Sequence, residues 1–480
     1  PSCQDCCVGV VTNDVAKSCA FCIAEPDPLT SMYDTIVIGG GFAGLSAAVA
    51  LSAQGARVAV LEARPRLGGR ATSYIDRVTG EVVDNGQHVL FGCYRETFKF
   101  LRAIGADSDV KSQPVFRVDY IDRDNDLVTL KASNFPAPFH LISAILKCDE
   151  LSLRERLAVF RMIMPLCYAG RDKDSARCNS AARLNETVRD WLVRNGQGSK
   201  LRELLWEPLA VAALNQQPDQ ASALLFARVL ANLSGPNPKD AAVGIPTKPL
   251  EQFYAQPARA FIESKGGEVR IRAPARIRVV NRRLVGVDVH GELLTGRTVI
   301  AAVPWFAFTR LFDHRPPTLE GVISRAMDMG SEPIVTVNVW FTRPVIDQPF
   351  IGLIGRTMQW VFNKHFPFGS AGSHVVLVSS GAHRLMSATN TELISLSLRE
   401  LSAAIPSARG AGVIHATAFR ERKATFSLAP GEPQRPDTKT PVAGLFLAGD
   451  WIETGLPSTI ESAVASGHRS AAAAYQTLAS

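Results

Sequence analysis

Apolar and polar positions follow two different periods along most of this chain. Residues 35–38 form a short β-branched run, residues 43–54 are rich in alanine and follow a helical period, and residues 57–61 form a second apolar run. Short apolar runs separated by a helical segment are typical of a βαβ unit, in which a helix connects two parallel strands. The pattern predicts that the folded part of the chain begins with such a unit.

The later segments follow other patterns. Helical periods dominate from about residue 98 to 233, with amphipathic runs over 151–164 and 183–193. Strand signals then return as three runs separated by turn residues, and these predict a β-meander: 269–280, 284–289 and 298–303. The remainder mixes both periods, with strands predicted over 335–341 and 375–379 and a helix over 391–404.

This alternation predicts the α/β class. A Rossmann-type dinucleotide-binding domain is expected to be interleaved with a mixed α+β substrate domain, because strand signals of the first type return after the helical region.

The first 32 residues differ from the rest, because five of the nine cysteines lie there. Cys3, Cys6, Cys19 and Cys22 have the spacing C-x2-C-x12-C-x2-C, which a zinc site could use, but few apolar residues accompany them. We interpret the segment as an extension outside the fold and assign no metal ligand, with a zinc site as the alternative. The other cysteines are scattered, which favours a reducing cytoplasmic location.

Composition and charge restrict the class of partner. Of the 480 residues, 46% are hydrophobic and 20% are charged, as in a folded globular protein, and the formal net charge is +7. No apolar run reaches the roughly 18 residues needed to cross a bilayer. Because no nucleic-acid motif is found and the Lys and Arg residues are dispersed, we expect no nucleic acid and favour peripheral contact with an anionic membrane surface.

Gly39, Gly41 and Gly44 form the pattern G-x-G-x-x-G between the first predicted strand and the first predicted helix. The first glycine permits a tight turn, the second lets the backbone approach a pyrophosphate, and the third lets helix and strand pack closely. The pyrophosphate binds at the helix N-terminus, where unpaired N–H groups favour anions. Glu62, at the end of the second strand, is placed to bind a ribose. These residues predict a dinucleotide and leave FAD and NAD open.

Two further motifs carry a resemblance to a known superfamily. Residues 62–70 read EARPRLGGR, and residues 444–466 read GLFLAGDWIETGLPSTIESAVAS. With these motifs the chain resembles the flavin amine oxidase and phytoene desaturase superfamily, which implies FAD as the cofactor. The resemblance implies cofactor roles for Arg70 and Asp450, and a helix after Ser458 whose N-terminus faces the flavin. A solvated Arg70 and a helix-capping Asp450 are the structural alternatives.

The motifs and the resemblance together imply a set of FAD-binding residues, in which Ile277 contacts adenine through its backbone: Gly39, Gly41, Phe42, Ala43, Gly44, Glu62, Ala63, Arg64, Gly69, Arg70, Gln87, His88, Ile277, Gly449, Asp450 and Ile460. The implied FAD-binding domain comprises residues 33–97, 241–303 and 421–480. The implied substrate domain comprises residues 98–240 and 304–420, and residues 1–32 lie outside both.

Two stretches carry a narrower resemblance. Residues 84–94, DNGQHVLFGCY, and residues 206–215, WEPLAVAALN, resemble the hydroxysqualene dehydroxylases, a squalene-associated group of the superfamily. This resemblance implies a lipophilic C30 isoprenoid substrate that loses its hydroxyl group and leaves squalene. Hydride from the reduced flavin would quench an allylic cation, and Glu207 or His88 would be the acid that assists C–O cleavage. The structural alternatives are an ion pair for Glu207 and a backbone contact for His88.

Other functions share the same cofactor motifs. An FAD-dependent desaturase of a carotenoid-type polyene, or a flavin amine oxidase, would transfer hydride in the opposite direction. A prenyl-lipid escort protein shares the fold without redox chemistry, but the glycines, Glu62 and Asp450 favour an enzyme. A second G-x-G-x-x-G motif is absent, so the sequence does not identify the electron donor.

Overall fold

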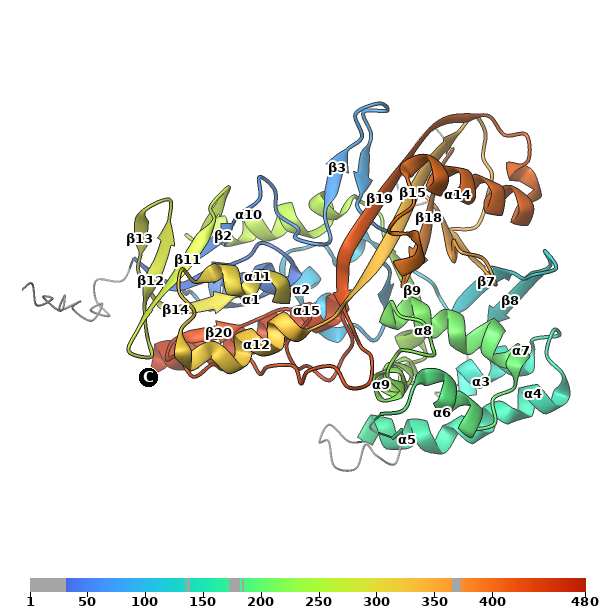
Figure 1. Cartoon of the computed structure of the whole chain (residues 1–480), viewed down its shortest axis with the longest axis horizontal. Helices are drawn as coiled ribbons and strands as arrows, with labels where there is room; N and C mark the ends of the chain where they lie inside the picture. Colours follow the sequence, from blue (N-terminus) through green and yellow to red (C-terminus); the bar gives the residue numbers. More distant parts are fainter. Residues whose placement is uncertain (1–31, 134, 136–138, 172–181, 184, 365–372) are drawn as a thin grey trace, which may run out of the picture.

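The structure is a computed structural model that describes residues 32–133, 135, 139–171, 182–183, 185–364 and 373–480. It consists of two parts that lie side by side (Figure 1). One contains the parallel sheet predicted from the first βαβ unit. The other contains a long mixed sheet and most of the short helices.

A parallel sheet is the centre of the first part. Its strand order is β10-β2-β1-β14-β20, and all neighbours are parallel. The strands come from segments far apart in the sequence: β1 (Tyr33–Ile38), β2 (Val58–Glu62), β10 (Glu268–Ile271), β14 (Gly296–Ala301) and β20 (Leu445–Leu447). The interleaved Rossmann-type arrangement predicted from the sequence is therefore confirmed.

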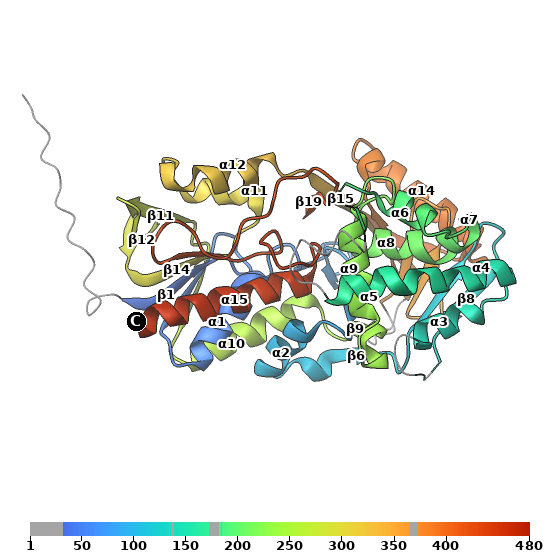
Figure 2. The same cartoon turned by 90° about the horizontal axis from the view of Figure 1, so that it is seen from below.

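Both faces of this sheet are covered, as parallel sheets require. Val37 and Ile300 pack in one apolar cluster with three helices, α1 (Phe42–Ala53), α10 (Gln256–Ser264) and α15 (Ile460–Ala479). Ile36 and Val299 pack on the other side against a β-meander: β11 (Ala275–Val280), β12 (Arg283–Val289) and β13 (Glu292–Leu294). Figure 2 shows α1, α10 and α15 together on one side of the sheet.

The second part contains a seven-stranded sheet of order β19-β15-β18-β17-β16-β7-β8. Its neighbours are antiparallel except for β16 and β7, which are parallel. One face packs on α14 (Asn390–Ala404). The strands are β7 (Arg117–Ile121), β8 (Leu127–Lys131), β15 (Ser331–Phe341), β16 (Phe350–Leu353), β17 (Trp360–Asn363), β18 (Ser373–Ser380) and β19 (Val413–Phe426).

Short helices lie beside this sheet and enclose an apolar region. They are α3 (Phe139–Leu146), α4 (Leu153–Ala158), α5 (Ile163–Arg171), α6 (Val188–Arg194), α7 (Ser199–Leu201), α8 (Glu207–Leu214) and α9 (Ala223–Leu233). A 3-10 turn, Val159–Met162, connects α4 to α5, and a π-helical turn, Arg202–Trp206, precedes α8.

The remaining elements connect the two parts or flank them. They are α2 (Arg95–Ala103), α11 (Trp305–Phe308), α12 (Glu320–Asp328), β3 (Ser73–Ile75), β4 (Val82–Asp84), β5 (Leu90–Phe91), β6 (Val110–Ser112) and β9 (Val243–Pro246). None of the helices in the described ranges combines the length and apolar character that crossing a bilayer demands.

Three predicted elements differ from the structure. The strand predicted over 269–280 is divided into β10 and β11, because Pro274 lacks an N–H for a ladder and Arg272 has a positive φ of 55°. The run predicted as the third strand of the meander is β14 of the parallel sheet instead. The region predicted as mostly helical also contains β6, β7 and β8. The cysteine segment with the zinc alternative lies outside the described residues.

Candidate functional site

The glycine turn after β1 has the geometry that its sequence predicts. Gly39 has a φ of 115°, and a Cβ at this position would lie 2.4 Å from the Ala302 carbonyl oxygen. A Cβ at Gly44 would lie 1.9 Å from the Gly39 carbonyl oxygen, so only glycine permits this approach of helix and strand. Both positions therefore need glycine for the fold itself.

Gly41 has a different role, because its surroundings are open. It is the N-cap of α1 and has no side chain to cap the helix. A Cβ there would meet only the backbone of Gly68 and Gly69, at 3.8 Å. The N–H groups of Phe42 and Ala43, the first residues of α1, are thus left for an anion, as the predicted pyrophosphate site requires.

Glu62 connects the end of β2 to this turn. Its carboxylate accepts hydrogen bonds from the Gly40 N–H and the Arg64 N–H, both at 2.8 Å, and the residue is buried. Ala63 and Arg64 follow directly, and the Arg64 guanidinium donates to the Gly69 carbonyl oxygen at 3.2 Å. A carboxylate oxygen has further acceptor capacity, so these bonds leave Glu62 able to bind a ribose hydroxyl.

A second glycine loop lies against the first. Gly69 has a φ of 59°, and a Cβ there would lie 3.3 Å from the Gly41 Cα. The loop is supported by Tyr254, whose hydroxyl donates to the Gly68 and Ala71 carbonyl oxygens at 2.8 and 2.9 Å. The Tyr254 ring also stacks on Phe42. Sequence reasoning missed Tyr254, because no local motif connects it to residues nearly two hundred positions away.

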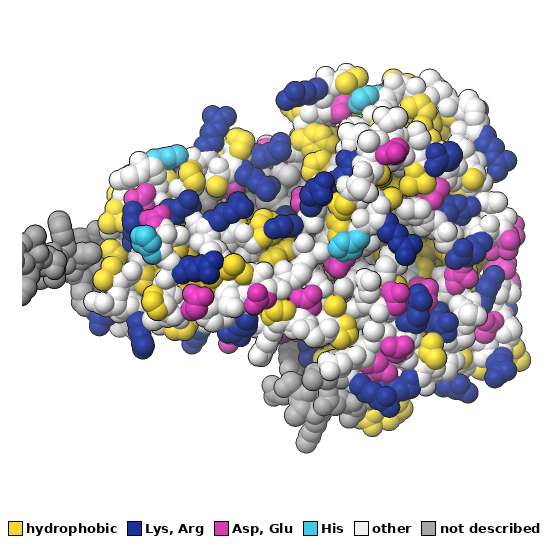
Figure 3. All heavy atoms as spheres, in the orientation of Figure 1, with side chains coloured by type: hydrophobic (Ala, Val, Ile, Leu, Met, Phe, Trp, Pro, Cys, Tyr) yellow, Lys and Arg dark blue, Asp and Glu magenta, His cyan; other side chains and the backbone are white. Residues whose placement is uncertain are grey.

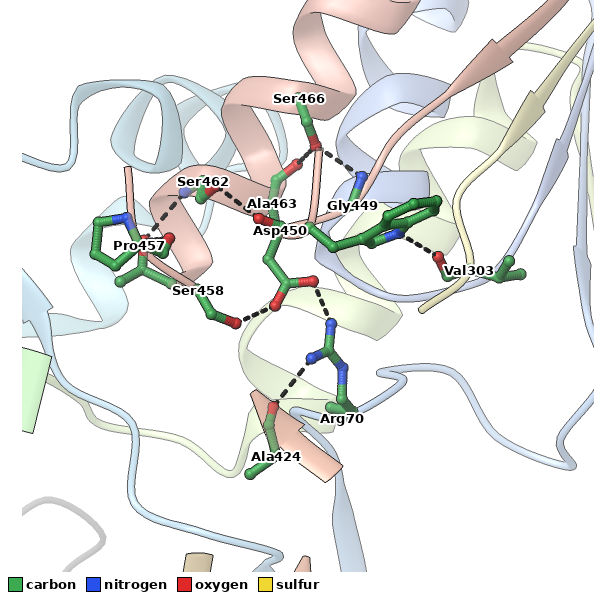
Figure 4. Close-up of polar contacts among 12 residues, drawn as sticks. Arg70, Val303, Ala424, Gly449, Asp450, Pro457, Ser458, Ser462, Ala463 and Ser466 are labelled. Carbon is green, nitrogen blue, oxygen red and sulfur yellow. Dashed lines mark hydrogen bonds and ion pairs between the residues drawn. The ribbon is translucent and has the colours of Figure 1, made fainter. Parts of the chain in front are cut away.

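The closing motif brings together residues that are far apart in the sequence (Figure 4). Asp450 forms an ion pair with Arg70, 380 residues away, and also accepts a hydrogen bond from Ser458. Arg70 donates in addition to the Ala424 carbonyl oxygen of β19 at 3.0 Å. The predicted cofactor residues Arg70 and Asp450 thus bind each other, and both parts of the molecule contribute to their surroundings.

The other predicted residues of this motif lie where α15 begins. Gly449 has a φ of 144°, and its N–H donates to the Ser466 hydroxyl at 2.8 Å. Thr459 caps α15 through the Ser462 N–H, and Ile460 is the first residue of the helix. Ile277 lies apart in β11, where its side chain is buried against the meander, and the adenine contact proposed for it stays a prediction.

Gln87 and His88 follow a segment that is bonded to Arg70. The Asn85 amide donates to the Arg70 carbonyl oxygen at 2.7 Å. Burial lowers the pKa of the His88 imidazole to about 4; the Asp84 carboxylate opposes this shift and the Lys364 ammonium adds to it. His88 is therefore neutral near pH 7. The Gln87 Oε1 atom is buried and has no hydrogen-bond partner in the described ranges.

These observations fit a bound dinucleotide. Open space lies before the N-terminus of α1, two glycine loops frame it, and a buried carboxylate stands at the end of the neighbouring strand. A second helix, α15, begins beside Arg70 and Asp450, where it can face a second anionic group. Across the described residues, we find no cluster of His, Cys, Asp and Glu able to hold a metal ion.

An apolar cavity of about 300 Å³ lies among the short helices. Aliphatic and aromatic side chains dominate its lining, and none of the described lining residues is charged: Phe116, Leu130, Leu141, Ile142, Ala144, Ile145, Val159, Met162, Ile163, Leu166, Cys167, Leu205, Trp206, Leu209, Leu230, Ala231, Leu233, Ser234 and Ala241. Trp206 lines the cavity, whereas its neighbour Glu207 does not. Glu207 lies 3.7 Å from both Arg189 and Arg202, with 29% of its side chain exposed.

Comparisons with known proteins show the family to which the chain belongs. The family model described as "Flavin containing amine oxidoreductase" matches residues 42–474. The hydroxysqualene dehydroxylase of Zymomonas mobilis is 28% identical over 452 residues, which cover 92% of this chain and 98% of that protein. The enzyme of the same name from Rhodopseudomonas palustris is 29% identical over 454 residues, covering 91% and 96%. The zeta-carotene desaturase of Zea mays is 26% identical over 475 residues, covering 91% and 82%.

Solved structures show the same fold. The cyclohexylamine oxidase of Brevibacterium oxydans has a TM-score of 0.70 at 18% identity, covering 93% of this chain and all of that chain (100%). Wild-type putrescine oxidase bound to putrescine also has a TM-score of 0.70 at 18% identity, covering 92% and 99%.

We expect Gly41→Val to fold and to lose the cofactor. Its Cβ meets no atom closer than 3.8 Å in the protein, but its methyl groups enter the space before α1. Flavin absorbance per mole of desalted protein should fall by about tenfold or more, which corresponds to at least 1.4 kcal/mol of binding free energy. The matched Gly44→Ala variant should instead unfold at lower temperature, because its Cβ meets the Gly39 carbonyl oxygen. Normal flavin content in folded Gly41→Val protein would contradict the assignment of this space to the pyrophosphate.

Proposed function

The chain belongs to the family of flavin-containing amine oxidoreductases and is an FAD-dependent oxidoreductase; from this premise we propose that it removes the hydroxyl group of hydroxysqualene and forms squalene. The relatives named hydroxysqualene dehydroxylase support this substrate. The observation that carries the proposal is the uncharged apolar cavity. A long isoprenoid gains free energy on entering such a cavity, at about 25 cal/mol for each Å² of apolar surface removed from water.

The cavity also favours an isoprenoid over an amine. An ammonium group that leaves water needs a nearby carboxylate or an aromatic cage to offset its desolvation. No carboxylate is found among the described residues that line the cavity. The relatives named zeta-carotene desaturase keep a polyene as the second candidate, since a polyene is apolar as well.

Reductive dehydroxylation requires one hydride and one proton. When bound, reduced FAD supplies the hydride. The carbon–oxygen bond breaks, the oxygen takes the proton and leaves as water, and the hydride completes the valence of the carbon. The protein must therefore hold a proton donor near the hydroxyl group and keep bulk water away from the electron-deficient carbon.

His88 is the better supported of the two proposed acids. It follows Asn85, whose amide donates to the carbonyl oxygen of Arg70 in the cofactor motif. Its pKa of about 4 means that it gives up a proton readily once protonated, but that few molecules carry the proton near pH 7. Glu207 is held between two arginines outside the cavity lining. This position supports a structural ion pair for Glu207.

A surface of the helical part suggests how a membrane-dissolved substrate would enter. Leu153, Leu157, Phe160, Met164 and Tyr168 are exposed, with 40–71% of their surfaces accessible, and follow a helical period of three or four residues. The same helical run contributes Val159, Met162, Ile163 and Leu166 to the cavity. We name the five exposed residues the apolar stripe.

We propose that the apolar stripe docks on an anionic bilayer. A helical run that is apolar on both sides is typical of a buried or membrane-contacting segment. The Lys and Arg side chains are spread over the face drawn in Figure 3, so electrostatic attraction would act through the net charge of +7. A substrate dissolved in the membrane would then reach the cavity through the wall that the stripe covers.

The reduced protein should convert hydroxysqualene to squalene. Dithionite-reduced protein is mixed anaerobically with the alcohol, and flavin reoxidation and product mass are followed together. We expect one squalene for each flavin reoxidised, because the reaction consumes one hydride. If the reduced protein leaves hydroxysqualene unchanged while the oxidised protein introduces double bonds into a polyene, the desaturase function replaces this proposal.

The single-turnover rate should rise as the pH falls if His88 is the acid. Above a pKa of about 4 the protonated fraction changes about tenfold per pH unit, so lowering the pH from 7 to 6 raises the rate. His88→Gln should remove this dependence and slow turnover by about a hundredfold. Glu207→Gln is the comparison and should keep both rate and pH profile. If Glu207→Gln instead slows turnover and removes the pH dependence while His88→Gln does not, Glu207 is the acid.

Association with anionic liposomes should depend on the apolar stripe. The double variant Leu157→Glu, Met164→Glu should lower the membrane-bound fraction at low salt by about tenfold or more, because each change removes an apolar group that would enter the bilayer and adds a charge of the same sign as the lipid. The control is Leu293→Glu, Met327→Glu, whose side chains are similarly exposed, at 47% and 55%, in the first part of the molecule. Co-sedimentation measures both. If the membrane-bound fraction falls equally in both double variants, membrane association depends on net charge and not on the apolar stripe.

A further inference from the structure

Strand β15 carries two polar residues on a face that is otherwise packed. Val335, Val337 and Val339 belong to the apolar cluster that includes α14, so the residues between them face the other side of the sheet. Thr336 and Asn338 occupy two of these alternate positions, each with 1% of its surface exposed. Buried polar side chains are unfavourable unless they form hydrogen bonds.

Thr336 Oγ1 and Asn338 Nδ2 have no partner in the part of the chain that the structure describes, and neither has Gln87 Oε1, in the residue after Gly86. Gly86 shows how two of the segments meet. A Cβ there would lie 3.8 Å from Thr336 Oγ1 and 4.0 Å from His88 Nε2. The hydroxyl and the imidazole thus flank a position without a side chain, directly beside Gln87. Several unpaired atoms in one region indicate a bound group that completes their hydrogen bonds.

The side-chain amide of Asn338 is oriented by His374 so that its Nδ2 can donate a hydrogen bond. Its Oδ1 atom lies 3.0 Å from His374 Nε2. Burial lowers the pKa of His374 to about 3, the Lys364 ammonium adds to this shift, and the Asp84 carboxylate opposes it. The neutral imidazole must carry its hydrogen on Nε2 to donate to the amide oxygen. His374 stacks on Trp340, with ring centroids 4.2 Å apart, which keeps the Asn338 amide in this orientation.

The charged groups nearby neutralise each other. Lys364 Nζ lies 3.0 Å from Asp84 Oδ2, and both side chains are buried. Asp84 also accepts hydrogen bonds from the Ser73 hydroxyl and the Leu250 N–H. Because these two charges compensate each other, neither of them favours a charged ligand. A neutral alcohol fits, because its oxygen accepts from an amide N–H while its O–H donates to an amide oxygen.

We propose that Thr336, Asn338 and Gln87 form a neutral subsite that binds the hydroxyl group of the alcohol substrate, with His374 as the positioning residue for Asn338. The subsite rests on the proposed function, since it assigns residues to the oxygen that is removed. It also gives a reason for product release. A hydrocarbon product has no group for these three atoms, so it binds less tightly than the alcohol.

The proposal predicts opposite effects on stability and binding. Thr336→Val removes an unpaired buried hydroxyl, so the FAD-bound protein without substrate should melt at the same or a higher temperature. The same variant should bind hydroxysqualene about tenfold more weakly, the typical value of one hydrogen bond, and squalene unchanged. Equilibrium binding to the oxidised FAD-bound protein measures both ligands without turnover. Thr336→Ser should retain the preference for the alcohol.

Asn338→Leu and His374→Ala should each lower the preference for hydroxysqualene over squalene. His374→Gln keeps a hydrogen-bond donor for Asn338 and should retain much of this preference. The control is Thr342→Val, an exposed threonine just beyond the end of β15. If Thr336→Val melts lower and the preference for the alcohol stays, the group is structural and the proposal is wrong. Altered FAD content or flavin absorption with unchanged alcohol binding would assign the three atoms to the cofactor and also overturn it. Because binding is measured without turnover, the binding result can be interpreted even if the dehydroxylation assay fails.

Discussion

The Arg70 guanidinium contacts both parts of the molecule at the proposed cofactor site. It pairs with Asp450 of the closing motif and donates to the Ala424 carbonyl oxygen of β19, so one side chain binds the dinucleotide part and the substrate sheet together. The Trp305 ring lies 5.3 Å from the guanidinium carbon and restricts it further. Asp450 is buried, and removing its partner would leave an uncompensated carboxylate, which typically costs several kcal/mol. Arg70 and Asp450 therefore contact the segment before α15, the Asn85 amide and β19 at one place.

The sequence predicts the parts of this site that local geometry decides. Gly39 and Gly44 are predictable because a tight turn and a close helix–strand contact exclude any Cβ, and this requirement is visible in a few consecutive residues. The pairing of Arg70 with Asp450 is different, since 380 residues separate them and they meet only in the folded protein, beyond the ends of β2 and β20. The motifs named both residues without indicating that they bind each other.

The errors in the fold prediction have local causes as well. Pro274 and the positive φ of Arg272 divide one apolar run into strands of two different sheets, and Pro274 was a readable signal. Strand β8, with its alternating exposed and buried residues, has the period of a strand but is only five residues long, which is too short to stand out among helices. Thr336 and Asn338 also carried a signal, because they interrupt the apolar positions of a strand whose other face carries Val335, Val337 and Val339.

The polar and apolar halves of the proposed substrate site have different consequences for stability. Apolar side chains dominate the lining of the cavity among the helices, and none of its described residues is charged, so an empty cavity mainly loses packing contacts. Thr336 Oγ1, Asn338 Nδ2 and Gln87 Oε1 instead have no partner among the described residues, and each such atom lowers the stability of the ligand-free protein. Proteins tolerate such atoms where a ligand completes them. A hydrocarbon chain held by the cavity would leave these atoms unpaired, whereas the proposed alcohol would pair them.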